Sequence, residues 1–96
     1  MMTWTAVRPH ELVWREWDGH AAIYDLGSGD THVINALALE ILTLLLPRAW
    51  SVQALVHELS DAMPEGLDQD EMARQIEQQL QLLAELGLVR AAQAQP

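Results

Sequence analysis

The chain contains no cysteine, no lysine and no phenylalanine among its 96 residues. Without cysteine, disulfides, thiolate metal sites and cysteine nucleophiles are excluded. The longest apolar run is too short to span a bilayer, and the N-terminus lacks a basic stretch followed by an apolar one. These absences predict a cytoplasmic protein with no membrane partner.

Positive charge is also scarce. Fourteen acidic residues oppose five arginines, so the net charge is −9 at pH 7. Affinity for nucleic acid depends on clustered cations that meet the phosphates. Here the arginines are scattered one per predicted element, so nucleic acid is not expected as a partner. They are Arg8, Arg15, Arg48, Arg74 and Arg90.

Apolar residues, in contrast, make up half of the chain, which is long enough for one domain with a single modest core. The most informative passage centres on Asn35, a residue type favoured as a helix N-cap. Val33 and Ile34 before it suit a strand. Residues 36–46 after it are almost wholly apolar, and Pro47 then ends the helix. A helix this apolar must be covered by other elements on most of its circumference.

Three strands are expected before this helix. Residues 12–17 are rich in strand formers, and Asp18-Gly19 suits the type I′ turn of a two-residue hairpin. Residues 20–26 form the return strand, residues 27–30 a second turn, and residues 31–34 the third strand. The sequence therefore predicts an antiparallel meander.

The expected register pairs Trp14 with Ile23 and Ile23 with Ile34 on one apolar face. Residues 1–11 are assigned to an N-terminal extension, because Pro9 is unsuited to a central strand.

Two further helices are expected. Ser51 caps the second, and Asp68 or Asp70 starts a third that runs to about Leu86, where Gly87 suits the C-cap. The second helix has an apolar stripe made of Val52, Leu55, Val56, Leu59 and Met63. Residues 91–96 are assigned to a disordered tail.

The fold predicted from this order is a winged-helix-like α+β domain over residues 12–90. It has a three-stranded antiparallel sheet followed by three helices.

The third helix has a wider apolar arc than one core contact needs. Its buried stripe is Met72, Ile76, Leu80 and Leu83. At about 100° per residue, Leu82 and Leu86 fall off one edge of that stripe, beside Gln75 and Gln79. Either the helix touches both the first helix and the sheet, or part of the arc lines an open groove.

Catalytic and metal-binding patterns are not found. His10, His20, His32 and His57 have no paired ligand spacing on one helix, so no metal site is expected. The serines lack a glycine-flanked elbow, and a phosphate-binding loop needs a lysine. Neither a cofactor nor an enzymatic activity is therefore expected.

Two surface features have alternative interpretations. Trp4 and Trp17 are either exposed interface residues or ordinary packing residues. The acids of the third helix favour a solvated face over a site for a basic peptide. These acids are Asp68, Asp70, Glu71, Glu77 and Glu85.

The order of elements and four passages resemble the PqqD-type peptide chaperones, also called RiPP recognition elements. The passages are Val33-Ile34-Asn35-Ala36, Ala38-Leu39-Glu40-Ile41-Leu42, Ser51-Val52 with Leu55, Val56 and Leu59, and Leu82-Leu83-Ala84-Glu85-Leu86-Gly87-Leu88-Val89. The chain looks most like the subset encoded beside an HPr-kinase-related protein. It departs from the family at residues 27–30, where the usual turns contain proline.

The resemblance implies a non-enzymatic chaperone that binds the leader segment of a ribosomally made precursor peptide. It would present the leader to a modifying enzyme, and the likeness to the subset adds the HPr-kinase-related protein as a further implied partner. The peptide would add as a strand beside the third strand, against the third helix. The implied peptide-binding residues are Thr31, His32, Val33, Ile34, Gln75, Gln79, Leu82 and Leu86.

Two alternatives remain open. One is a winged helix-turn-helix transcription regulator whose third helix enters the major groove. The other is a small adaptor that dimerises through the same sheet edge. A monomer or weak dimer is expected.

Overall fold

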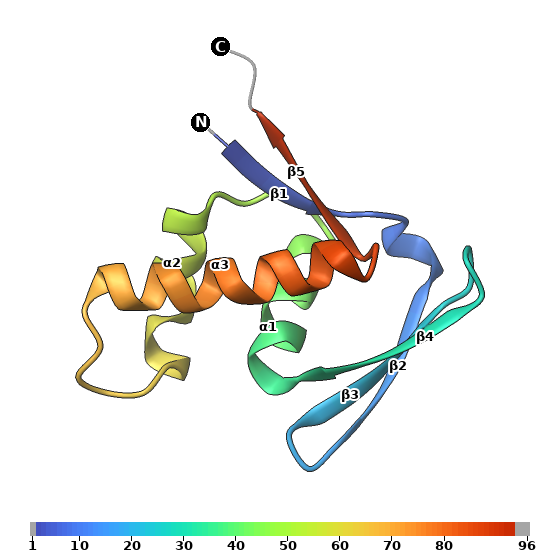
Figure 1. Ribbon diagram of the computed structural model, residues 1–96, viewed down its shortest axis with the longest axis horizontal. Helices are drawn as coiled ribbons and strands as arrows, with labels where there is room; N and C mark the ends of the chain where they lie inside the picture. Colours follow the sequence, from blue (N-terminus) through green and yellow to red (C-terminus); the bar gives the residue numbers. More distant parts are fainter. Residues whose placement is uncertain (1, 94–96) are drawn as a thin grey trace.

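The computed structural model describes residues 2–93, and it confirms the predicted fold class (Figure 1). Strands β2, β3 and β4 form an antiparallel meander, and α1, α2 and α3 follow it. Strands β1 and β5 form a second, two-stranded antiparallel sheet. The elements are β1 (Met2–Ala6), β2 (Leu12–Trp17), β3 (His20–Asp25), β4 (Asp30–Asn35), α1 (Ala36–Leu45), α2 (Val52–Leu59), α3 (Gln69–Glu85) and β5 (Val89–Gln93), with short 3-10 turns at Pro9–Glu11 and Ser60–Ala62.

The hairpin between β2 and β3 has the predicted turn. Asp18 and Gly19 have φ values of 45° and 76°, the positive pair that a type I′ turn requires. Trp17 therefore lies opposite His20, and the predicted pairing of Trp14 with Ile23 is confirmed.

The register between β3 and β4 differs from the prediction. Ile23 lies opposite His32 rather than Ile34, and Ile34 lies opposite Ala21. The cause is the turn, where the Asp25 carboxylate accepts hydrogen bonds from the backbone N–H groups of residues 27 and 28 at 3.0 and 3.3 Å. The shift is by two residues, which leaves every side chain on its expected face. Ile34 is accordingly buried.

An ion pair between the buried Asp25 and the partly exposed Arg8 holds this turn. Asp25 is only 2% exposed, and its Oδ2 lies 2.6 Å from Nη2 of Arg8. The hydrogen bond from Arg8 lowers the pKa of Asp25 from 3.8 to about 2, against the opposing effect of burial and with help from the two turn N–H groups. The segment before β2 thus fixes the turn before β4.

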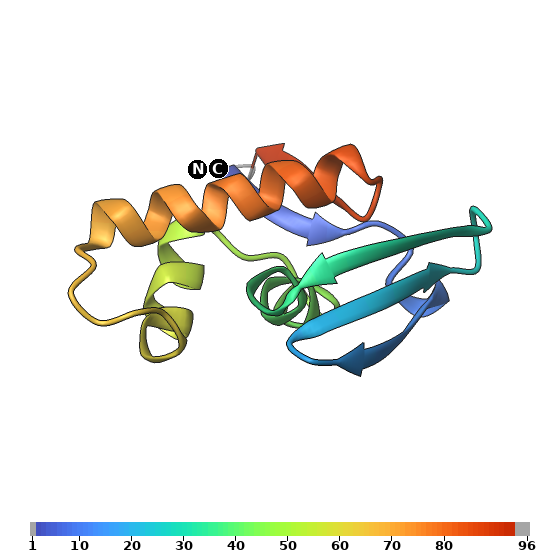
Figure 2. The same ribbon diagram turned by 60° about the horizontal axis from the view of Figure 1, so that its bottom comes forward.

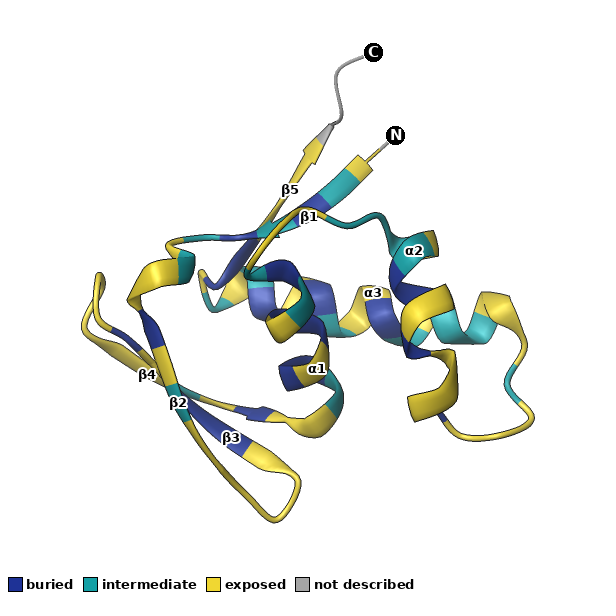
Figure 3. Cartoon of the chain, turned by 180° about the vertical axis from the view of Figure 1, so that it is seen from behind, coloured by how far each residue is buried: buried dark blue, intermediate teal, exposed yellow. Residues whose placement is uncertain are grey.

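Each helix begins at a side-chain cap. Asn35 Oδ1 accepts from the N–H of Ala38 at 2.8 Å, as predicted. Ser51 caps α2, and Asp68 rather than Asp70 caps α3. Helix α1 lies beneath α3 and beside the sheet (Figure 2), so its apolar surface is covered as expected. Figure 3 shows the buried residues of the three helices facing one another, while the tip of the β2–β3 hairpin is exposed.

The N-terminal and C-terminal assignments were wrong. Residues 2–6 are not a free extension but strand β1, and residues 91–93 belong to β5, which pairs with it. Residues 94–96 lie outside the described part of the chain. On its other side β1 contacts the segment before α2, because Trp4, which is only 6% exposed, exchanges two backbone hydrogen bonds with Trp50 at 2.7 and 2.9 Å. Trp4 is therefore a core residue, whereas Trp17 is 46% exposed.

Within residues 2–93 no helix has the length and apolar content needed to cross a membrane.

Candidate peptide-binding site

Strand β4 is an end strand of its sheet, with β3 on one side. The type I′ turn directs the N–H of His20 toward β2, because the fourth turn residue donates to the first. Leu26, which is even-numbered like His20, donates its N–H to the Glu11 carbonyl at 2.8 Å. Along an antiparallel strand, successive residues direct their backbone N–H and C=O groups to opposite sides. The odd-numbered residues of β3 therefore hydrogen-bond to the even-numbered residues of β4. Thr31 and Val33 therefore direct their backbone N–H and C=O groups toward the outer edge.

The side chains of β4 divide between two environments. Thr31 and Val33 point to the solvent face of the sheet, and Val33 is 61% exposed. Ile34 is 2% exposed and belongs to the core, and its backbone groups face β3, so neither its side chain nor its backbone N–H and C=O face the outer edge. His32 is half-buried, and its Nε2 atom is buried with no hydrogen-bond partner among residues 2–93.

The leucines of α3 differ in exposure according to their position on the helical arc, as predicted. Leu83 is fully buried, whereas Leu82 is 40% exposed. Leu86 is half-buried and packs against the core cluster, so it lines any groove only with part of its surface. Gln75 and Gln79 are also half-buried.

One hydrogen bond joins the strand to the helix. Asn35 Nδ2 donates to Oε1 of Gln79 at 3.2 Å, at the end of β4. Leu82 and Leu86 lie about one and two turns further along α3. Figures 1 and 2 show β4 and the C-terminal half of α3 extending from this contact on the same side of the molecule. The predicted site residues thus flank one region, joined at one end.

The sequence assigned Asn35 only as a helix cap. In the structure its Oδ1 caps α1 while its Nδ2 reaches α3. Nothing local marks the second role, because Gln79 lies 44 residues further along the chain. The site offers unpaired backbone groups at a strand edge, side-chain amides and apolar side chains. Such groups suit the binding of a peptide rather than catalysis. Among residues 2–93, no three histidine or acidic side chains gather to hold a metal ion.

The fold is shared with solved proteins, although neither protein-family models nor curated proteins match the chain. One is TbiB1 in complex with the TbiA(beta) leader peptide, with a TM-score of 0.68 and 18% identity over 95% of this chain and 99% of that one. Another is lasso peptide synthetase B1 complexed with the leader peptide, with a TM-score of 0.65 and 20% identity over 91% of this chain and 96% of that one. At these identities the likeness establishes the fold alone.

Proposed function

We propose that this chain is a peptide-binding chaperone that captures the leader segment of a ribosomally made precursor by strand addition to β4. It then presents the leader to a modifying enzyme. The observation that carries the proposal is the free edge of β4, where Thr31 and Val33 offer backbone donors and acceptors. An unpaired strand edge is a template for an added strand.

Two further observations support it. The chain has the fold of two proteins solved with leader peptides, and the match covers nearly the whole length of each. In addition, the resemblance to the PqqD-type chaperones implies the same binding mode. We expect the protein to act in the cytoplasm and without catalytic groups of its own.

The roles of the site residues follow from their exposure. Thr31 and Val33 supply the backbone contacts, and Val33 adds an apolar side chain on the solvent face. Leu82 is the main apolar contact on α3, with Leu86 contributing its accessible part. The amides of Gln75 and Gln79 bound the region on the helix.

The expected partner is an enzyme that modifies the peptide attached to this leader. An HPr-kinase-related protein is a further candidate for the same assembly, on the strength of the sequence resemblance alone.

The test uses synthetic peptides that cover the N-terminal segments of the short reading frames beside this gene. They are labelled and titrated with the protein in fluorescence polarisation. The bound complex is then mapped by NMR, and the proposal expects slowed exchange of the Thr31 and Val33 amide protons. A peptide that binds while leaving those two amides unprotected would exclude strand addition to β4.

The alternatives are separated by two simple measurements. Tight, salt-sensitive binding to duplex DNA would favour the transcription regulator. A stable dimer at micromolar concentration, seen by sedimentation and protecting the Val33 amide without peptide, would favour the adaptor.

A further inference from the structure

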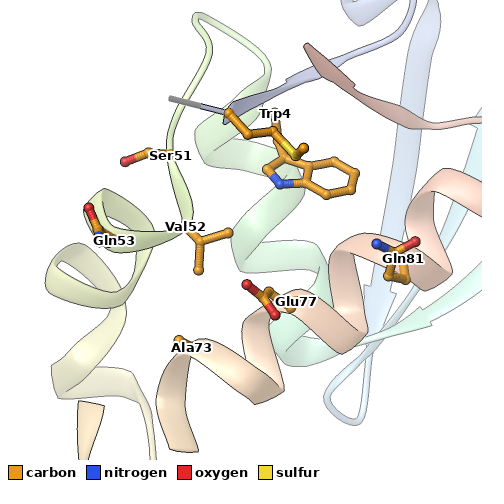
Figure 4. Close-up of a pocket in the computed structure, with 8 residues that line it drawn as sticks. Trp4, Ser51, Val52, Gln53, Ala73, Glu77 and Gln81 are labelled. Atoms are coloured by element: carbon orange, nitrogen blue, oxygen red, sulfur yellow. The ribbon is translucent and has the colours of Figure 1, made fainter. Parts of the chain in front are cut away.

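Helix α3 has a second concave side. A cavity of about 490 Å³ lies between β1, the start of α2 and α3. Figure 4 shows Val52 and Glu77 projecting from the two helices into the space below Trp4. A second cavity of about 340 Å³ lies between α2 and α3, and the two share Gln53 and Ala73. Because these two residues line both, the two cavities adjoin, and the pair is here called the α2–α3 trough.

The trough lies on the opposite face of α3 from the proposed leader site. At about 100° per residue, Glu77 is about 40° from Ala73 around the helix, whereas Leu82 and Gln79 are about 180° and 120° away. A peptide added to β4 therefore leaves the trough open. Both surfaces can be occupied at the same time.

The floor of the trough is lined by apolar side chains, and its α3 side carries negative charge. Val52, Val56 and Ala73 line it, and Met2, which is 55% exposed, stands at its β1 end. Asp70 and Glu77 supply two carboxylates, and no arginine lines either cavity within the described residues.

The two carboxylates define a spacing. Asp70 and Glu77 are seven residues apart on α3, or about 10.5 Å along the helix axis. A polyproline II segment has three residues per turn and a rise of about 3.1 Å per residue, so side chains three residues apart lie on one face, about 9.3 Å apart. A segment in that conformation with two cationic side chains at that interval would meet both carboxylates.

We propose that the α2–α3 trough docks a basic, partly apolar segment of a partner protein. The proposal does not depend on the leader site; if the proposed function holds, the modifying enzyme is the natural source of the segment. The two carboxylates disfavour an anionic ligand. They also disfavour a second copy of this chain, which has a net charge of −9 and no two arginines three residues apart.

The probe is a short synthetic peptide with two arginines three residues apart and leucine between them, titrated into isotope-labelled full-length protein. Its counterpart has glutamates in place of the arginines. We expect the amide resonances of Gln53, Ala73 and Glu77 to shift with the arginine peptide only. Glu77→Gln should weaken its affinity roughly two- to fivefold, as expected for a partly exposed ion pair.

Two matched variants complete the design. Glu40→Gln makes the same change of charge on the exposed side of α1 and should leave the affinity unchanged. Val33→Pro, which alters the leader edge, should also leave it unchanged, so failure of the two sites is distinguishable. Absence of binding, shifts centred outside the trough, or equal weakening by Glu40→Gln and Glu77→Gln would each overturn the proposal.

Discussion

Asn35 and Gln79 join the last residue of β4 to the middle of α3 through a 3.2 Å hydrogen bond between their side-chain amides. The same Asn35 caps α1 through its other side-chain atom. One residue therefore starts the central helix and sets the position of the strand edge relative to the helix proposed to face the peptide.

The two roles of Asn35 separate in a mutational series. Gln79→Ala removes only the bond to α3 and should lower the free energy of unfolding by about 0.5–1 kcal/mol. Asn35→Ala also removes the cap and should cost about 1–2 kcal/mol. Denaturant unfolding of both single variants and the double variant measures the coupling. Equal losses in the two single variants would contradict the dual role.

Proline substitutions distinguish the outward from the inward backbone groups of β4. Val33→Pro removes an N–H that faces the free edge, so the domain should stay folded while leader binding is lost. His32→Pro removes an N–H that faces β3 and should destabilise the sheet by about 1–3 kcal/mol, because a ladder carbonyl loses its donor. Thermal melts and a peptide titration compare the two. Unfolding by Val33→Pro would show that the assigned alternation is wrong.

Neighbouring leucines on α3 give a second contrast. Leu82 is 40% exposed, so Leu82→Glu should change the unfolding free energy by about 0.5 kcal/mol or less. It should nevertheless weaken leader binding strongly, because it places an unpaired charge against an apolar contact. Leu83 is fully buried, and Leu83→Ala should cost about 2–5 kcal/mol of stability. If Leu82→Glu unfolds the domain as badly as Leu83→Ala, Leu82 is only a core residue.

Local features, such as helix caps and tight turns, were predictable from the sequence. The caps at Asn35, Ser51 and Asp68 and the turn at Asp18-Gly19 each depend on a few adjacent residues, and all are present. The exposure of Leu82 also followed from its angle on a single helix. Such features need no knowledge of the rest of the fold.

Long-range features were not predictable in this way. Trp4 pairs with Ala91 across almost the whole chain, so neither segment alone signals a strand. The register of β4 depends on the length of the turn before it, which the Asp25 carboxylate fixes with Arg8. Because the strand positions depend on that pairing, the sequence predicted which face each residue of β4 occupies but misplaced the strand by two residues against β3.

The Arg8–Asp25 pair also predicts how stability responds to acid. The pKa of Asp25 is lowered from 3.8 to about 2 in the folded protein, so the unfolded chain binds the proton first as pH falls. The stabilisation is therefore complete above about pH 4 and is lost progressively as pH falls toward about 2. Arg8→Met should lower stability at pH 7 and flatten this decline.

The control is Arg15→Met, which removes the same charge from an exposed position on β2. Denaturant unfolding of wild type and both variants at pH 7, 4 and 2.5 measures the effect. Arg15→Met should keep the wild-type decline between pH 4 and 2.5. If Arg8→Met declines as steeply as Arg15→Met, another carboxylate is responsible for the acid sensitivity. If Arg8→Met declines less steeply, protonation of Asp25 is responsible for the acid sensitivity. The turn before β4 is then no longer held by Asp25 in acid, and leader binding should weaken over the same pH interval.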